Sequence, residues 1–278
     1  MTTEAPTPIS RTTTTARGRR TVTPLQRTLR LARFETSMLA KQRTTLVTLL
    51  SGPLLVLGLA AISPSSSPQA LAALAGMGVV VVMSLTTHFA AVMLTVNRRE
   101  AQVLKRLRTS ELSGSELVTG MYLPLAVVGV LESLAVVAVL AARGGALPDA
   151  VGWLPWLAGV LIGSAGLVAA GVAVAGLSGN AEKANWAAVP LLVVISGAAN
   201  MLTVGVLPEA VRQVLLLVPF ASLTDLVART SGASVSLVEL PDVVAGVPPE
   251  LVDLVLLLLW TVVFAAVAKK LWRWEPRG

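Results

Sequence analysis

Long apolar segments alternate with short polar ones along most of the chain. A helix that crosses the hydrocarbon core of a bilayer needs about 20 predominantly apolar residues. Polar segments rich in Ser, Gly and Pro, such as SPSSSPQA and RGGALPDA, separate segments of that length. The pattern predicts an all-α, polytopic membrane protein with six transmembrane helices, at residues 44–62, 71–96, 118–142, 153–178, 186–206 and 251–268.

The residues before the first apolar segment divide into two parts. Residues 1–23 include nine threonines and no apolar run, which predicts a disordered cytoplasmic tail. Residues 24–43 place apolar side chains on one arc of a helix and basic side chains opposite, which predicts an interfacial amphipathic helix on the inner leaflet. That helix either anchors the chain or also contacts a cytosolic partner. Residues 269–278 form a short cytoplasmic tail at the other end.

The region between the fifth and sixth expected spans, residues 207–250, contains apolar stretches that are too short to cross a bilayer. Pro208 and Pro219 interrupt them. We expect short re-entrant helices that dip into the outer leaflet and return. The alternative is an ordinary extracellular loop that lies on the membrane surface.

Composition excludes several classes of protein. The chain is 54% apolar and only 13% charged, against about 25% charged residues in soluble domains. Cysteine is absent and His88 is the single histidine, so little material exists for a metal site or a catalytic triad. We therefore expect no catalytic residue and no metal. Aromatic residues make up 4% of the chain, which argues against base stacking and a nucleic-acid partner.

The net charge of +7 is explained by topology. Of 22 Lys and Arg residues, 19 fall in the terminal segments, the 97–117 loop and the loop after the fourth span. Basic residues are retained on the cytoplasmic side. We expect a multi-pass protein in the plasma membrane, in a bacterial cell, with both termini cytoplasmic.

The loop at residues 97–117 carries the most distinctive pattern. Val103, Leu104 and Leu107 recur at helical spacing among basic residues, which predicts a short amphipathic helix in the cytoplasm. Ser113 and Glu116 have the spacing of a capping box, which would fix the start of the third span relative to that helix. Because of this rigid connection, a movement of the cytoplasmic helix would also move the third span.

Two motifs resemble the permease subunits of type-2 ABC exporters, a family that includes drug-resistance exporters. They are RREAQVLKRLRTSELSGSEL between the second and third spans, and the stretch from Ser196-Gly197 through Leu207-Pro208-Glu209 to Pro219-Phe220. The resemblance covers about residues 24–270. It implies a second permease copy, identical or related, and a separate ABC ATP-binding subunit that binds ATP and Mg. This chain has no Gly-rich loop followed by Lys and Ser or Thr.

The resemblance also implies that the 97–117 loop is a coupling loop on which the ATP-binding subunit docks. The residues expected to couple to it are Arg98, Arg99, Glu100, Leu104, Lys105, Arg106, Leu107, Arg108 and Glu111.

Polar residues inside the expected spans are candidates for a substrate path. Glu132 lies in the third span, and a carboxylate near the bilayer centre costs a few kcal/mol, so it must face a partner or a cavity or be protonated. It contacts a cationic substrate or is hydrogen-bonded within the bundle. His88 is either a packed, hydrogen-bonded residue or a proton relay. Asn200 either hydrogen-bonds between helices or contacts the transported molecule.

The expected function is that of the permease subunit of an ATP-driven exporter for a hydrophobic or amphipathic small molecule, drug-like or antibiotic-like. A polysaccharide or lipid-linked glycan exporter of the same family is the first alternative. A membrane-embedded structural or enzyme protein without an ATPase partner is the alternative from another class.

Overall fold

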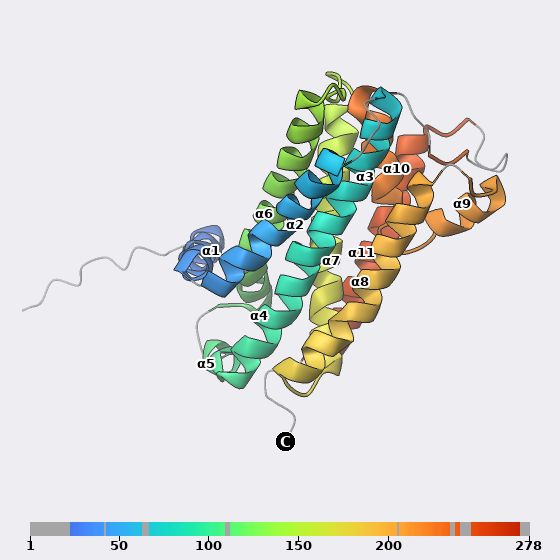
Figure 1. Ribbon diagram of the computed structural model, residues 1–278. Coiled ribbons are helices and arrows are strands. Elements are labelled where there is room, and N and C mark those ends of the chain that lie inside the picture. Colours follow the sequence, from blue (N-terminus) through green and yellow to red (C-terminus); the bar gives the residue numbers. More distant parts are fainter. Residues whose placement is uncertain are drawn as a thin grey trace, which may run out of the picture.

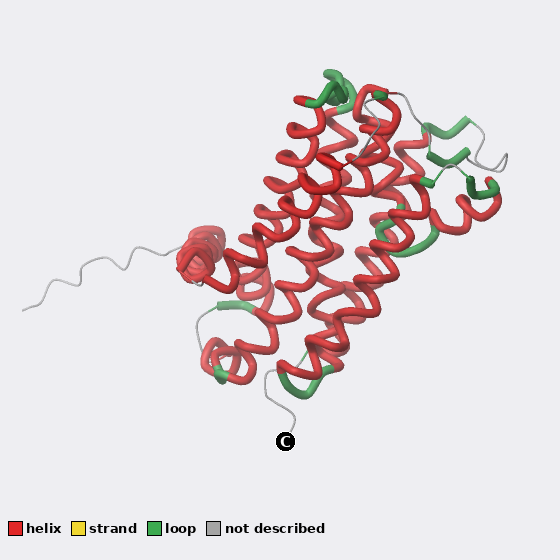
Figure 2. Tube along the Cα trace, viewed as in Figure 1, coloured by secondary structure: helices red, strands yellow, loops and turns green. Residues whose placement is uncertain are grey.

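The structure is a computed structural model that describes residues 23–41, 43–62, 67–108, 112–204, 206–233, 237–239 and 246–272. Helices account for most of these residues, and no strand occurs among them (Figure 2). The all-α prediction is confirmed. The elements are α1 (Pro24–Lys41), α2 (Arg43–Ile62), α3 (Pro68–Met83), the π-helix η1 (Ser84–His88), α4 (Phe89–Glu100), α5 (Val103–Arg108), α6 (Gly114–Ala142), α7 (Trp153–Leu177), α8 (Ala181–Thr203), α9 (Glu209–Leu216), α10 (Ser222–Ala228), the π-helix η2 (Arg229–Ala233) and α11 (Pro249–Leu271).

Five of these helices are long and apolar enough to cross a membrane. They are α6, α7, α8, α11 and one continuous helix of 33 residues, Pro68–Glu100, that joins α3, η1 and α4. They correspond to the second to sixth expected spans. The first expected span, residues 44–62, forms α2, of which Leu50–Ile62 is a shorter apolar helix. Five of the six expected spans are therefore supported, and the first one, at residues 44–62, stays a prediction. Both tails lie almost entirely outside the described residues.

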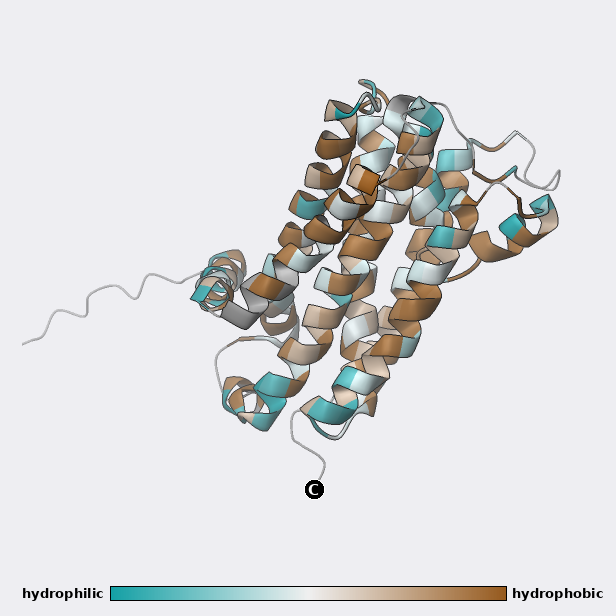
Figure 3. Ribbon diagram, viewed as in Figure 1, coloured by the Kyte–Doolittle hydropathy of each residue, from teal (hydrophilic) through white to brown (hydrophobic). Residues whose placement is uncertain are grey.

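The long helices run side by side as a bundle, and α1 lies across one of its sides (Figure 1). Apolar residues dominate the long helices, whereas hydrophilic residues gather at α5 and at the start of α8 (Figure 3). We call this end of the bundle the α5 end. The turn between α7 and α8 and the last residues of α11 lie there too.

The opposite half of the bundle contains a short helix that is buried in the protein. All seven residues of α10 are buried, and α10 packs against α3, α7 and α11. The small residues of α7 make this possible: a Cβ atom built on Gly159 would lie 2.3 Å from Leu226 Cδ2, and one on Gly166 would lie 2.4 Å from Phe220 Cε1. Irregular backbone at membrane depth is tolerated where protein covers it. Whether α9 and α10 enter the outer leaflet stays a prediction.

Candidate functional site

The last three residues of α4 are charged, and each contacts a different helix. Arg98 Nη2 donates a hydrogen bond of 2.5 Å to Glu35 Oε2 of α1. The Glu35 side chain is 2% exposed. Burial raises the pKa of Glu35, and the nearby Arg98 charge lowers it only in part. This ion pair fixes α1 to the end of α4.

Arg99 is fully buried and contacts the end of α7. Its Nη1 and Nη2 atoms donate to the carbonyl oxygens of Ala175, at 3.2 Å, and Ser178, at 2.6 Å. The last carbonyl groups of a helix have no partner within the helix and carry the negative end of its dipole. A buried guanidinium satisfies both needs, so Arg99 acts as a C-terminal cap supplied by another helix.

Glu100 contacts the start of α8. Its Oε1 atom accepts a hydrogen bond of 2.8 Å from the Ala181 backbone nitrogen, and Asn180 Oδ1 accepts one of 2.9 Å from the Lys183 nitrogen. A carboxylate is favourable at the positive end of a helix dipole. Arg99 and Glu100 therefore hold the two sides of the α7–α8 turn, and we call them the bracket.

A sharp turn leads from α4 into α5. Gln102 adopts a left-handed backbone conformation with φ of 55°, and α5 follows at Val103. Leu104 is fully buried in an apolar cluster with Leu39, Met121 and Tyr122, whereas Arg106 is exposed. Leu107 is half-buried. The predicted short helix is thus present and is anchored by Leu104. Glu111 and the side chains of Lys105 and Arg108 lie outside the described residues.

The start of α6 is fixed by the predicted capping box. The Glu116 nitrogen donates to Ser113 Oγ at 3.3 Å, and the Ser113 nitrogen donates to Glu116 Oε2 at 2.7 Å, which confirms the motif. Glu116 Oε1 also pairs with Arg27 Nε of α1 at 3.1 Å. The helix α1 is therefore tied to both helices that flank α5.

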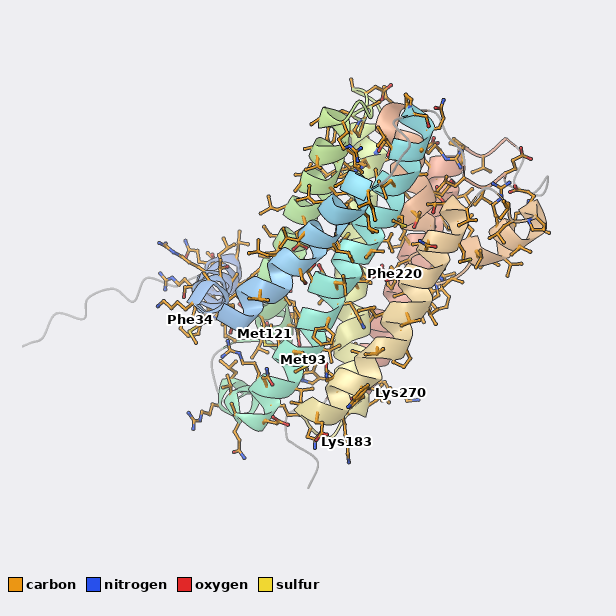
Figure 4. The ribbon with its side chains drawn as sticks, in the orientation of Figure 1. Phe34, Met93, Met121, Lys183, Phe220 and Lys270 are labelled. Atoms are coloured by element: carbon orange, nitrogen blue, oxygen red, sulfur yellow. The ribbon has the colours of Figure 1, made fainter. Side chains whose placement is uncertain are left out.

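Further basic side chains gather at the α5 end. Lys183 of α8 and Lys270 of α11 lie at this end of the bundle, whereas Phe220 lies about halfway along it (Figure 4). Exposed positive charge thus lies on α8 and α11 as well as on α5, at Arg106.

A second polar group lies halfway along the bundle, around η1. Thr86 Oγ1 lies 2.5 Å from Glu132 Oε2 of α6 and 2.8 Å from the Val82 carbonyl oxygen. The next residue, Thr87, lies against Gly129 of α6: a Cβ atom built on that glycine would lie 2.6 Å from Thr87 Oγ1. His88 is fully buried and approaches the backbones of Leu167 in α7 and Ala188 in α8. Thr86 and Thr87 thus face α6, whereas His88 faces α7 and α8.

The three candidate path residues do not form one group. Glu132 contacts η1, which contains His88, but the two side chains face different helices. Asn200 Nδ2 donates to Met77 Sδ at 3.3 Å, nine residues before Thr86 and so about 13 Å away along that span. Among the described residues, no group of three or more His, Asp and Glu side chains could hold a metal ion.

Several buried polar residues were missed in the sequence, at η1 and at α10. Thr86 and Thr87 belong to the run SLTTH, a polar interruption of an apolar span that could have drawn attention. A buried pair, Asp225 with Arg229, was also missed: Asp225 Oδ1 accepts from the Leu237 nitrogen at 2.7 Å and so holds residues 237–239 against α10.

Comparison with curated proteins finds no match. The sequence profile described as "ABC-2 family transporter protein" matches residues 29–269, from α1 to the end of α11. This match covers most of the chain and includes the bracket, α5, η1 and the buried helix α10. The chain therefore belongs to the ABC-2 family of transporter proteins, and it is a multi-pass membrane protein.

Proposed function

We propose that the protein is the membrane-spanning permease subunit of an ATP-driven ABC exporter that moves a hydrophobic or amphipathic small molecule out of the cell. The observation that carries this proposal is the way in which α5 is joined to the bundle. It follows α4 directly, and the end of α4 contacts α1, α7 and α8 through Arg98, Arg99 and Glu100. Membership of the ABC-2 family supports the same conclusion.

In this proposal the α5 end is cytoplasmic, and a separate ATP-binding subunit with bound ATP and Mg docks on α5. When α5 is displaced, three sets of contacts pass the movement on to the helices of the bundle. The bracket moves the α7–α8 turn, the Arg98–Glu35 pair moves α1, and the capping box at Ser113 moves α6. Because hydrogen bonds and ion pairs link all three, these helices respond together rather than one by one.

The membrane topology belongs to the same proposal. We take α2 as the first of six spans, α1 as a helix at the inner leaflet, and α9 with α10 as the re-entrant segment of the outer leaflet. The helices α8 and α11 have the lowest buried shares among the five apolar spans, 28% and 17%, against 67% for α7. Their exposed faces would contact lipid and a second permease copy. The largely apolar interior, with isolated polar groups such as the one at η1, suits an amphipathic cargo.

Co-purification tests the proposal. The permease carrying an affinity tag is expressed with each ABC ATP-binding subunit of its own genome, and the complex is isolated in detergent. We expect one such subunit to bind in stoichiometric amounts and the complex to hydrolyse ATP. Arg106→Glu should reduce the bound ATPase at least tenfold, because it reverses an exposed charge on α5.

The matched control is Lys183→Glu, which reverses an exposed charge at the same end of the bundle but on α8. It should leave most of the bound ATPase in place. Absence of any bound ATPase, or equal loss in both variants, would contradict docking on α5.

A further inference from the structure

The contact between Thr86 and Glu132 lies near the middle of two spans. Thr86 is two residues, about 3 Å, from the centre of the helix Pro68–Glu100, and Glu132 is four residues, about 6 Å, from the centre of α6. Both residues are at least 90% buried. The helix α2 also packs against this contact. A Cβ atom built on Gly52 of α2 would lie 3.1 Å from Val82 Cγ1 and 3.3 Å from Thr86 Cγ2.

The hydrogen atoms at this contact can be counted. Thr86 Oγ1 lies within hydrogen-bonding distance of two oxygens, Val82 O at 2.8 Å and Glu132 Oε2 at 2.5 Å. A carbonyl and an ionised carboxylate are both acceptors only, whereas a threonine hydroxyl has a single hydrogen. That hydrogen satisfies one of the two. Both contacts are full, unshared hydrogen bonds only if Glu132 supplies the second hydrogen as a protonated carboxylic acid.

The surroundings of the second carboxyl oxygen favour the same protonation state. Glu132 Oε1 is buried and makes no hydrogen bond to any residue that the structure describes. An ionised carboxylate with one oxygen in apolar surroundings is strongly disfavoured, whereas the carbonyl oxygen of a neutral acid is tolerated there.

No described cation compensates the charge. Three basic side chains of the helices packed against α6 and η1 have partners elsewhere: Arg98 pairs with Glu35, Arg99 caps α7, and Arg27 pairs with Glu116. The nearest titratable side chain along the chain, His88, is directed at the α7 and α8 backbones.

We infer that Glu132 is a proton-binding site in the helix bundle, where it donates a hydrogen bond to Thr86, and that a cation can replace its proton. In this arrangement the Glu132 carboxylic acid donates to Thr86 Oγ1, and the Thr86 hydroxyl donates to the Val82 carbonyl oxygen. Each hydrogen then makes one hydrogen bond. Loss of the proton alone would leave an unpaired buried carboxylate, which is strongly disfavoured. We therefore expect the proton to leave only when a cation binds in its place. One monovalent cation enters as one proton departs to water, and the net charge of the site is unchanged.

This inference rests on the proposed function for its ligand class, a hydrophobic organic cation. Such a cation would reach Glu132 when α2 moves away from η1 and α6. We place this route at α2 because Gly52 of α2 packs against Thr86. The helix α2 also follows α1 directly, and Glu35 and Arg27 hold α1 to the helices around α5.

Infrared difference spectroscopy tests the inference on the full chain in lipid nanodiscs, without an ATPase. At neutral pH, we expect a carboxylic acid C=O stretching band that shifts in D₂O and is absent from Glu132→Gln. The matched control is Glu239→Gln, which removes an exposed carboxyl group and should leave the band unchanged. Absence of the band from a folded wild-type protein would overturn the inference.

The cation is tested with tetraphenylphosphonium, and its neutral analogue triphenylphosphine serves as the control. Saturating tetraphenylphosphonium should abolish the band and release about one proton per bound cation into weakly buffered medium, whereas triphenylphosphine should do neither. A band that persists with bound cation would overturn the exchange.

Thr86→Val tests the donor assignment, because it removes the hydroxyl and keeps the shape of the side chain. The band should shift to the frequency of an acid without a hydrogen-bond partner, and Thr86→Ser should restore it. An unchanged band in Thr86→Val would overturn the assigned contact. Since no ATPase is present, these outcomes do not depend on whether an ATP-binding subunit docks on α5.

Discussion

One continuous helix, Pro68–Glu100, carries two polar regions of opposite character. At its α5 end, three consecutive charged side chains each contact another helix, and their partners are a carboxylate, two carbonyl groups and a backbone nitrogen. Near its middle, η1 carries hydroxyl groups and a histidine, with a single carboxyl group opposite Thr86. The same helix thus uses charges at its end and neutral hydrogen bonds at its centre.

The difference follows from what each environment offers. Helix ends leave backbone groups without partners, and the dipoles of α7 and α8 favour Arg99 at one end and Glu100 at the other. No such groups exist in the middle of a helix, where all backbone groups are paired. A π-helical turn there widens the backbone, and such turns occur frequently at functional sites. The end of the helix therefore connects helices, and the middle holds the buried polar groups that we propose as a ligand site.

The largest effect is expected for Arg99→Ala. The change leaves the carbonyl groups of Ala175 and Ser178 buried without their charged donor, which should lower the free energy of unfolding by roughly 3 kcal/mol. Unfolding by SDS in mixed micelles measures the loss. Arg30→Ala, an exposed residue of α1, is the control and should change little. Equal stability of Arg99→Ala and the wild type would show that the bracket is dispensable.

A smaller loss of stability is expected for Arg98→Ala, and a second substitution, Glu35→Gln, should restore most of it. Arg98→Ala leaves Glu35 buried without its cation and should cost about 2 kcal/mol. Glu35→Gln should cost less, because a neutral side chain tolerates burial. In the double variant most of the Arg98→Ala loss should be recovered, with a coupling energy of about 1–2 kcal/mol in a double-mutant cycle. Additive losses would mean that the pair does not act as one unit.

The sequence and the structure agree wherever the determining interaction is local. The helices follow from the length of each apolar run, and the Ser113–Glu116 box follows from residues three positions apart. Glu132 was recognisable as a buried acid because an apolar span surrounds it. These features depend on neighbours in the chain, which a single sequence displays.

The contacts that give the site its character are not local. Arg99 meets Ala175 across 76 positions, and Thr86 meets Glu132 across 46. In the sequence, Arg98, Arg99 and Glu100 formed one basic-acidic motif, and nothing in it separated their three partners. Short helices were expected between residues 207 and 250, yet nothing in the sequence indicated that glycines of α7 admit one of them, α10. Tertiary packing alone decides these pairings.

Substitutions at the centre of the helix should lower the free energy of unfolding less than those at its end. Thr86→Val should lower the free energy of unfolding by about 1 kcal/mol, because it removes one hydrogen bond between neutral groups. Glu132→Gln should cost no more than this, since its amide can donate to Thr86 as the acid does. The same SDS titration measures both. A loss in Glu132→Gln as large as that in Arg99→Ala would indicate that Glu132 is ionised and paired.

The smallest effect concerns pH at the α5 end. Because burial outweighs the Arg98 charge, the pKa of Glu35 lies above its ordinary value of 4.5. Folding therefore favours the protonated form, and the contribution of Glu35 to stability rises as the pH falls through its folded pKa toward 4.5. Glu35→Gln is neutral at every pH and serves as the reference. The wild type should gain stability relative to Glu35→Gln as the medium is acidified from pH 7 toward pH 5. A relative loss would mean that the Arg98 charge dominates, and α1 would then be held by a charge pair that acid breaks.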